Sequence, residues 1–159
     1  MAKGISSTQV LPYVLERDLN LPKDRQTIFW IKPRKGHDSN MITRYYVKAI
    51  IERGDGTRDM DVKMADNANI VAFKTVVKKI ENFAFSDEYY EKHPNIKEKA
   101  KEVKYVDDDG RECVDYYVPV IETEDMIIDV YHELDDAAIR EIMNVASDVS
   151  KLGNVEKKY

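Results

Sequence analysis

The chain has 159 residues, of which 43% are apolar and 35% charged, and its formal net charge is −5. This length suits one domain with a substantial core, and no apolar run reaches the ~18 residues that a membrane-spanning helix needs. Cys113 is the single cysteine, which excludes an intrachain disulfide framework. The N-terminus lacks the apolar core of a signal peptide, so synthesis in the cytoplasm is expected.

The N-terminal third predicts a small β-ribbon. Residues 27–31 (TIFWI) are β-branched and aromatic and form the clearest strand. Residues 10–15 are apolar but contain Pro12, so they can form at most an edge strand. Phe29 and Trp30 point to opposite faces of an extended strand, so one should face the core and the other a partner or solvent. Residues 1–9 are expected to form a flexible N-terminal arm.

Residues 41–53 allow two interpretations. Apolar and aromatic side chains at helical spacing favour a helix that Asp38, Ser39 or Asn40 could cap. The alternative is one strand of a hairpin, because GDGT at 54–57 is a good turn and MDVKM could return as the second strand.

Residues 67–83 are expected to form the central helix. Ile70, Phe73, Val77 and Ile80 recur at three- and four-residue steps, which places them on one helical face. Asp66 or Asn67 could cap its first turn. The apolar face of this helix requires a partner surface from the rest of the chain.

The C-terminal half predicts a β-hairpin and then two helices. Residues 103–106 and 113–120 flank the turn signal DDDG, and residues 96–102 read as an exposed helical turn. Thr123 is a good N-cap for one helix, and Asp135 or Asp136 can start a second. Together they should form an αα-hairpin that covers the central helix.

The predicted fold class is therefore α+β: a mainly helical core (central helix plus C-terminal αα-hairpin) with an N-terminal β-ribbon and a small β-hairpin. The single domain should span residues 10–153, followed by a basic tail over 154–159. Truncation of Leu134 to Ala is expected to cost ~2–5 kcal/mol, because the side chain is predicted to lie in the core. The predicted core consists of Phe73, Val77, Ile80, Ile127, Val130, Leu134, Ile142 and Met143.

Signals for catalysis, cofactors and metals are weak. His37, His93 and His132 are far apart and lack metal-ligand spacing. The acidic run before Gly110 does not fit the register of a calcium loop. The chain lacks a phosphate-binding glycine loop and a nucleophile elbow. We therefore expect a protein that is not an enzyme and uses no cofactor or metal.

The charges are divided along the chain. Residues 107–148 contain fourteen acidic and two basic side chains, a net −12 that leaves +7 for the remainder. One interpretation is that both sets are solvated faces. The other is that a basic pole meets an acidic pole, within one chain or head-to-tail between subunits. The basic pole would be Lys32, Arg34, Lys35, Arg44 and Lys48, and the acidic pole Asp125, Asp129, Asp135 and Asp136.

Three blocks resemble a known group of proteins. They are LPKDRQTIFWIKPRKGHD at 21–38, KKIENF at 78–83, and HELDDAAIREIMNVASDVSKLGNVEKK at 132–158. In this order they resemble small proteins from the morphogenesis modules of tailed bacteriophages, including tail-assembly-chaperone-like proteins. Residues 86–118 form a long insertion relative to that group. The residues that carry the resemblance are Phe29, Lys32, Pro33, Asn82, Phe83, Glu133, Leu134, Ser150, Leu152, Lys157 and Lys158.

The resemblance implies a non-enzymatic protein that binds other phage structural proteins in the host cytoplasm during assembly. An alternative is a virion component, such as a head–tail connector or a capsid-decorating protein. It could use the N-terminal ribbon to extend a neighbour's sheet. A small enzyme is the third and weakest alternative. Neither nucleic acid nor a membrane is expected as a partner.

Overall fold

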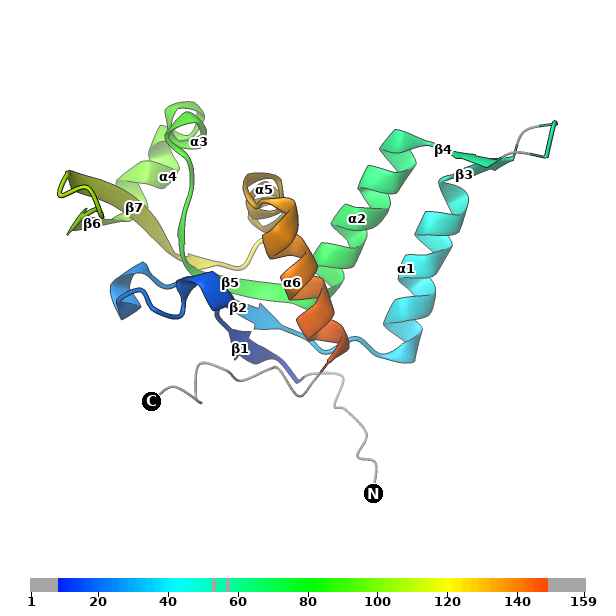
Figure 1. Cartoon of the computed structure of the whole chain (residues 1–159), viewed down its shortest axis with the longest axis horizontal. Helices are drawn as coiled ribbons and strands as arrows, with labels where there is room; N and C mark the ends of the chain where they lie inside the picture. The colour runs from blue at the N-terminus through cyan, green and yellow to red at the C-terminus, as the bar shows by residue number, and fades with distance from the viewer. Residues whose placement is uncertain (1–8, 53, 57, 149–159) are drawn as a thin grey trace, which may run out of the picture.

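A five-stranded antiparallel sheet with strand order β1-β2-β5-β7-β6 forms the base of the molecule, and helices α5 and α6 lie over one of its faces (Figure 1). The computed structural model describes residues 9–52, 54–56 and 58–148. The fold is α+β, as predicted. Residues 1–8, most of the expected N-terminal arm, and 149–159, including the expected basic tail, lie outside the described residues.

The N-terminal ribbon is present and is part of the larger sheet. Strand β1 (Leu11–Tyr13) pairs only with β2 (Ile28–Ile31), so it is an edge strand, as Pro12 predicts. Two short 3₁₀ turns, η1 (Glu16–Asp18) and η2 (Lys23–Arg25), connect the two strands. The other edge of β2 pairs with β5, which the sequence did not predict as a strand.

Strands β2 and β5 are neighbours in the sheet, but in the sequence a helical segment that projects from the sheet lies between them. It consists of α1 (Gly36–Lys48), the two-stranded ribbon β3 (Ile50–Glu52) and β4 (Arg58–Met60), and α2 (Val62–Val76). Figure 1 shows α1 and α2 side by side, with the β3–β4 ribbon at their far end. We call this unit the projection, and the sheet with α3–α6 the body.

The expected helix over 41–53 is therefore only partly correct. Helix α1 starts at Gly36 because the carboxylate of Asp38 accepts the Lys35 N–H at 3.0 Å and closes the first turn. It ends at Lys48, and the hairpin alternative applies to the residues that follow. Ala49 O accepts the Asp61 N–H at 2.6 Å, which holds the ends of the two helices together.

The central helix over 67–83 is the main error of the sequence prediction. Helix α2 starts earlier, because the carboxylate of Asp61 caps the N–H of Met64 at 3.1 Å, and it ends at Val76. The chain then continues as strand β5 (Val77–Ala84), which pairs with β2 and β7. A register shift opposite Trp30 and Ile31 and the left-handed conformation of Asn82 (φ 59°) interrupt the strand alternation.

This irregularity explains the misleading pattern. Val77, Ile80 and Phe83 are all buried, so the core-facing residues of β5 occur at every third position instead of every second. A three-residue apolar spacing is the signature of a helix. The strand therefore resembles a continuation of α2 in the sequence.

Residues 86–118 form the end of the body opposite the projection (Figure 1). Helices α3 (Asp87–Lys92) and α4 (Pro94–Lys99) precede the predicted hairpin, which is confirmed as β6 (Lys101–Val106) and β7 (Glu112–Ile121). Gly110 takes φ 77° in the turn, a conformation that favours glycine. Lys101 and Lys104 lie on the open edge strand β6, where lysine opposes pairing with another sheet.

Helices α5 (Glu124–Glu133) and α6 (Asp136–Ser147) are the two predicted C-terminal helices, but they diverge after their short connection and pack on α2 more than on each other, so they do not form the predicted αα-hairpin. Thr123 and Asp135 cap them through the N–H groups of Met126 and Ala138. Both helices contact α2 as well as covering the sheet. Within the described residues, no helix is long and apolar enough to cross a bilayer.

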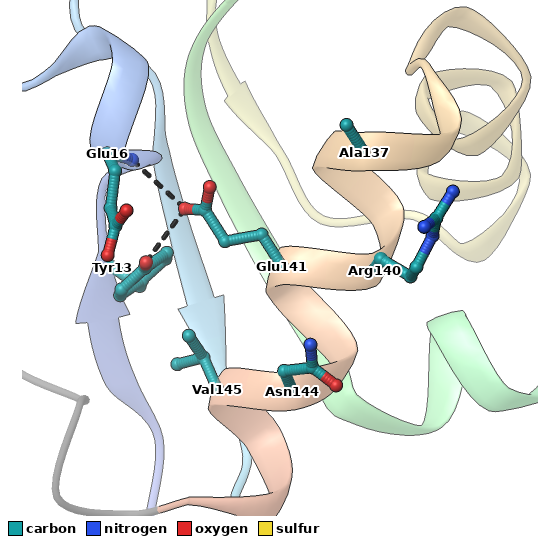
Figure 2. Close-up of a pocket in the computed structure, with 7 residues that line it drawn as sticks. All are labelled: Tyr13, Glu16, Ala137, Arg140, Glu141, Asn144 and Val145. Carbon is teal, nitrogen blue, oxygen red and sulfur yellow. Dashed lines mark hydrogen bonds between the residues drawn. The ribbon is translucent and has the colours of Figure 1, made fainter.

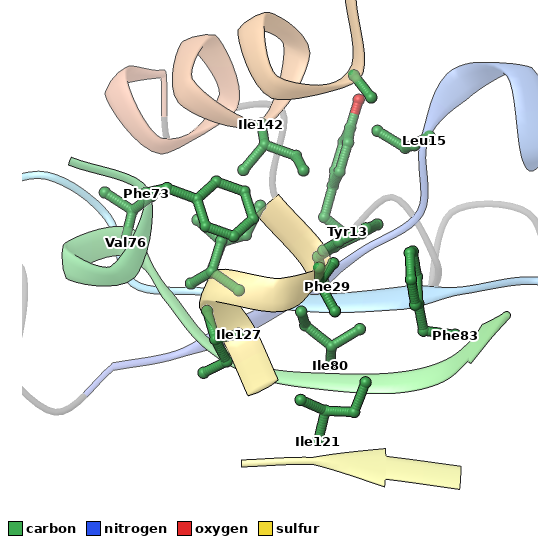
Figure 3. Close-up of a cluster of buried hydrophobic side chains, with 14 of the residues drawn as sticks. Tyr13, Leu15, Phe29, Phe73, Val76, Ile80, Phe83, Ile121, Ile127 and Ile142 are labelled. Carbon is green, nitrogen blue, oxygen red and sulfur yellow. The ribbon is translucent and has the colours of Figure 1, made fainter. Parts of the chain in front are cut away.

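The core lies between the sheet and the three helices α2, α5 and α6 (Figure 3). Six of the eight predicted core residues are buried, but Leu134 and Met143 are only partly buried because they lie at its margin. The cost of truncating Leu134 should therefore be smaller than the sequence suggested. The largest fully buried side chains are Phe29, Phe73, Ile31, Ile80, Ile121 and Ile142.

Candidate protein-binding surface

A cleft between β1 and α6 looks at first like a catalytic site (Figure 2). Its volume is about 320 Å³, and the carboxylate of Glu141 accepts the Tyr13 hydroxyl at 2.7 Å and the Glu16 N–H at 3.0 Å. Burial, with the hydrogen bond to Glu141, raises the pKa of Tyr13 well above its usual range. Tyr13 therefore stays neutral at physiological pH, and the cluster ties the edge strand to α6.

A second polar cluster joins α3 to α5. The Tyr89 hydroxyl donates to Asp129 at 2.8 Å, and Ser86 donates from its N–H and its hydroxyl to the Glu133 carboxylate at 2.9 and 3.1 Å. Burial, again with its hydrogen bond, raises the pKa of Tyr89. His93 stacks on Tyr89 with ring centroids 4.2 Å apart. These groups satisfy one another, so we assign them to stability.

The described residues contain no group of three or more His, Cys, Asp or Glu side chains placed to hold a metal ion. In the two polar clusters above, the hydrogen bonds join groups of the chain itself.

A groove between α1, α2 and α6 has a volume of about 420 Å³. Ile42, Ala72, Ile139 and Met143 supply an apolar floor, and the Tyr46 hydroxyl donates to the Asn69 side chain at one wall. Arg34 and Arg140 also line the groove. Figure 2 shows that Arg140 leaves α6 away from Glu141, so the two do not neutralise each other there.

The basic residues that were predicted as an interaction site lie in different surroundings. Lys32 lies 3.6 Å from the Asp38 carboxylate. Burial alone would raise the pKa of Asp38, but the Lys35 N–H and the charge of Lys32 together lower it. Arg34 lines the groove, whereas Arg44 and Lys48 are exposed on α1.

Two of the predicted acidic residues have internal partners. Asp135 accepts Arg17 at 2.8 Å and caps α6, and Asp129 accepts Tyr89. Asp125 and Asp136 are exposed. No ion pair between described residues joins this acidic set to the basic set within the chain.

The strand alternation predicted for Phe29 and Trp30 is confirmed. Phe29 is fully buried in the core, and Trp30 points to the other face of the sheet, where it is half-buried. Lys79 lies over the Trp30 ring, with its Nζ 5.8 Å from the centroid. Trp30 is therefore available to water on the sheet face opposite the core.

The far end of the projection is the most apolar exposed surface. Val62 is 80% exposed and Val47 is 59% exposed, and Ile50 and Met64 are also exposed. These are four of the seven exposed large apolar side chains among the described residues, and the Ala49–Asp61 hydrogen bond brings their elements together. We call these four residues the projection tip.

Sequence reasoning missed the projection tip and Arg140. A signal for the tip was present: Val47 lies off the predicted apolar face of its helix, and Val62 was placed in a return strand only under the alternative hairpin interpretation. Arg140 gave no local signal, because it lines the groove only once α1 and α6 have each packed against α2.

Comparison with known proteins gives no relative: no family model, no curated protein and no solved structure matches this chain.

Proposed function

We propose that this chain is a non-enzymatic bacteriophage morphogenesis protein that binds other phage structural proteins, in the manner of a tail-assembly chaperone. The observation that carries the proposal is the projection, with its apolar tip held away from the body. Exposed apolar groups that gather in one place mark protein interaction sites. The sequence resemblance supplies the phage context.

Several of the residues that carry the resemblance have structural roles here, whereas Ser150, Leu152, Lys157 and Lys158 lie outside the described residues. Phe29 fills the core, Lys32 pairs with Asp38, and Glu133 binds Ser86. Asn82 donates from its side chain to the backbone oxygens of Asp24 and Gln26, each at 2.9 Å. A group of proteins that shared these residues would share the body, which supports a common fold rather than a common active site.

The alternative is a virion component. It differs from a chaperone because it remains in the finished particle. Extension of a neighbour's sheet through the N-terminal ribbon finds little support, because β1 has three residues and one of them is Pro12. Binding through the projection tip suits either role. Mass spectrometry of purified particles separates the two, since a chaperone is absent from them and a virion component is present.

The binding proposal is tested by co-expression with the products of the genes that flank its own. The wild-type chain should bind at least one of them. The triple variant Val47→Ser, Val62→Ser, Met64→Ser should lose at least about tenfold in affinity, because burial of these side chains would drive association.

A control carries Val120→Ser, which changes an exposed valine on β7, away from the projection tip. This control should bind the flanking product like the wild type. Full affinity of the triple variant, or no binding of any flanking product by the wild type, contradicts the proposal.

A further inference from the structure

The groove between α1, α2 and α6 combines an apolar floor with two arginines that have no carboxylate partner among the described residues. Neither Arg34 nor Arg140 forms an ion pair with a described residue. The Nε of Arg34 is buried and has no hydrogen-bond partner in the described part of the chain. A buried N–H without a partner is costly, and a guanidinium pairs well with a carboxylate. Arg140 is exposed at the same groove, so its charge is accessible to a ligand. The groove therefore suits an apolar segment that carries acidic groups.

The β6–β7 hairpin at the opposite end of the body has these properties. Val106 is 64% exposed and Val114 is also exposed, and Asp108 and Asp109 occupy the turn between the strands. Asp107 is used internally, because one of its carboxylate oxygens accepts the N–H groups of Asp109 and Arg111 at 3.0 and 2.8 Å. Asp108 and Asp109 are exposed at the hairpin end.

We infer that the hairpin end of one copy binds in the α1–α2–α6 groove of a second copy. Asp108 and Asp109 would face Arg34 and Arg140, and Val106 and Val114 would cover the apolar floor. The charges, the apolar areas and the shapes are complementary: the groove is concave and the hairpin projects.

Other segments of the chain fit the groove less well. The sequence after residue 148 contains three lysines and one glutamate, so its charge opposes the arginines. Helix α5 is acidic, but its apolar residues Ile127 and Val130 are already buried in the core of its own chain. In the hairpin, by contrast, Val106 and Val114 remain exposed close to the acidic turn.

This contact differs from the one that the sequence suggested. Arg34 belongs to the predicted basic pole and also takes part in this contact. Its acidic partners, however, lie in the hairpin and not among the predicted acidic residues of α5 and α6. Because the two surfaces lie on different parts of the molecule, the contact is head-to-tail and repeats into a ring or a filament. It does not depend on the proposed function.

Sedimentation velocity at 0.1 M and 1 M salt tests the contact first. The wild-type chain should associate with rising concentration at low salt, and less at high salt, since the Debye length falls from ~10 Å to ~3 Å. A wild-type chain that remains monomeric at all concentrations at low salt overturns the inference.

Complementary charge reversal tests the two surfaces. The groove variant (Arg34→Glu, Arg140→Glu) and the hairpin variant (Asp108→Lys, Asp109→Lys) should each associate at least about tenfold more weakly than the wild type, because like charges would then meet. An equal mixture of the two should recover association, because each reversed surface then meets its complement. No recovery in the mixture, or wild-type association of either variant alone, overturns the inference.

Two controls keep the result interpretable. Lys63→Glu with Lys99→Glu makes the same change in charge as the groove variant on exposed positions outside both surfaces, and should associate like the wild type. If the groove variant does not fold, by circular dichroism, Arg34→Gln with Arg140→Gln replaces it and should weaken association in the same direction. The projection-tip variant should self-associate normally, so failure here and failure of the proposed function are separate results.

Discussion

The body and the projection differ in how their side chains are used. In the body, β2 and β5 supply Phe29, Ile31, Val77 and Ile80, each buried from solvent. In the projection, α1 buries only Asp38 and Ile42, and the buried residues of α2 are Ala68, Ala72, Phe73 and Val76, away from the exposed tip. Local stability follows buried apolar contact, so the tip should open more readily than the body.

This difference separates folding from binding. Substitutions in the body should change the free energy of unfolding, whereas substitutions at the tip should change binding and leave stability almost unaltered. The predictions below test that separation, from the largest expected loss of stability to the smallest.

Phe29→Ala should destabilise the chain by about 3–5 kcal/mol, because it removes a fully buried ring and leaves a cavity between sheet and helices. The free energy of unfolding is measured by urea titration. The neighbouring change Trp30→Ala, on the opposite sheet face, should cost clearly less. Equal losses would mean that both faces of β2 are equally important for the core.

Asn82→Ala should cost about 1–3 kcal/mol, because Asn82 combines φ 59° with two side-chain hydrogen bonds that hold the 24–26 loop. Asn82→Gly is the matched control, since glycine tolerates positive φ but lacks the side chain. In urea titrations, the glycine variant should lose some free energy of unfolding, but less than the alanine variant. A glycine variant less stable than the alanine variant would argue against backbone strain at this position.

Tyr13→Phe should cost about 0.5–1.5 kcal/mol at pH 7, where it removes the hydrogen bond to Glu141. Burial and this bond raise the pKa of Tyr13 in the folded state, so the stabilisation is complete below the unfolded pKa of about 10 and is lost as pH rises above it. The gap between wild type and variant in urea titrations should therefore narrow from pH 9 to pH 11. A constant gap would contradict the raised pKa. Tyr89→Phe should behave in the same way.

Val62→Ser should change the free energy of unfolding by less than about 0.5 kcal/mol, because the side chain is 80% exposed. Thermal unfolding monitored by circular dichroism is sufficient to detect a larger effect. A loss above about 1 kcal/mol would show that the tip packs within its own chain, and would weaken its assignment as a binding surface.

The elements that the sequence predicted correctly are those with local signals. Thr123 and Asp135 cap α5 and α6 as expected, and the DDDG turn joins β6 to β7. These signals depend on a few adjacent residues and on little else. The β-branched and aromatic run at 27–31 likewise indicated β2 without knowledge of its partners.

The elements that the sequence did not predict correctly depend on contacts between residues that are far apart in the sequence. Strand β5 was predicted as helix because its buried residues recur every third position, and only the pairing with β2 and β7 makes it a strand. The groove was not predicted for the same reason: Arg34 and Arg140 line it together only after α1 and α6 have each packed against α2. Of the predicted interaction residues, the structure places Arg34 in a groove and gives Asp129 and Asp135 internal partners.

The projection leaves the sheet and returns to it at one place. Ile31 and Val77 are paired in adjacent strands, and the Lys32 N–H donates to Val76 O at 2.7 Å, so all the residues between them form a closed loop. The entropy of closing a flexible loop rises slowly, by about 0.6 kcal/mol for each doubling of length. The outer part of the projection could therefore lengthen or shorten over evolution with little cost to the sheet. Its reach could change with the partner, while Phe73 and Val76 keep the base of α2 anchored in the core.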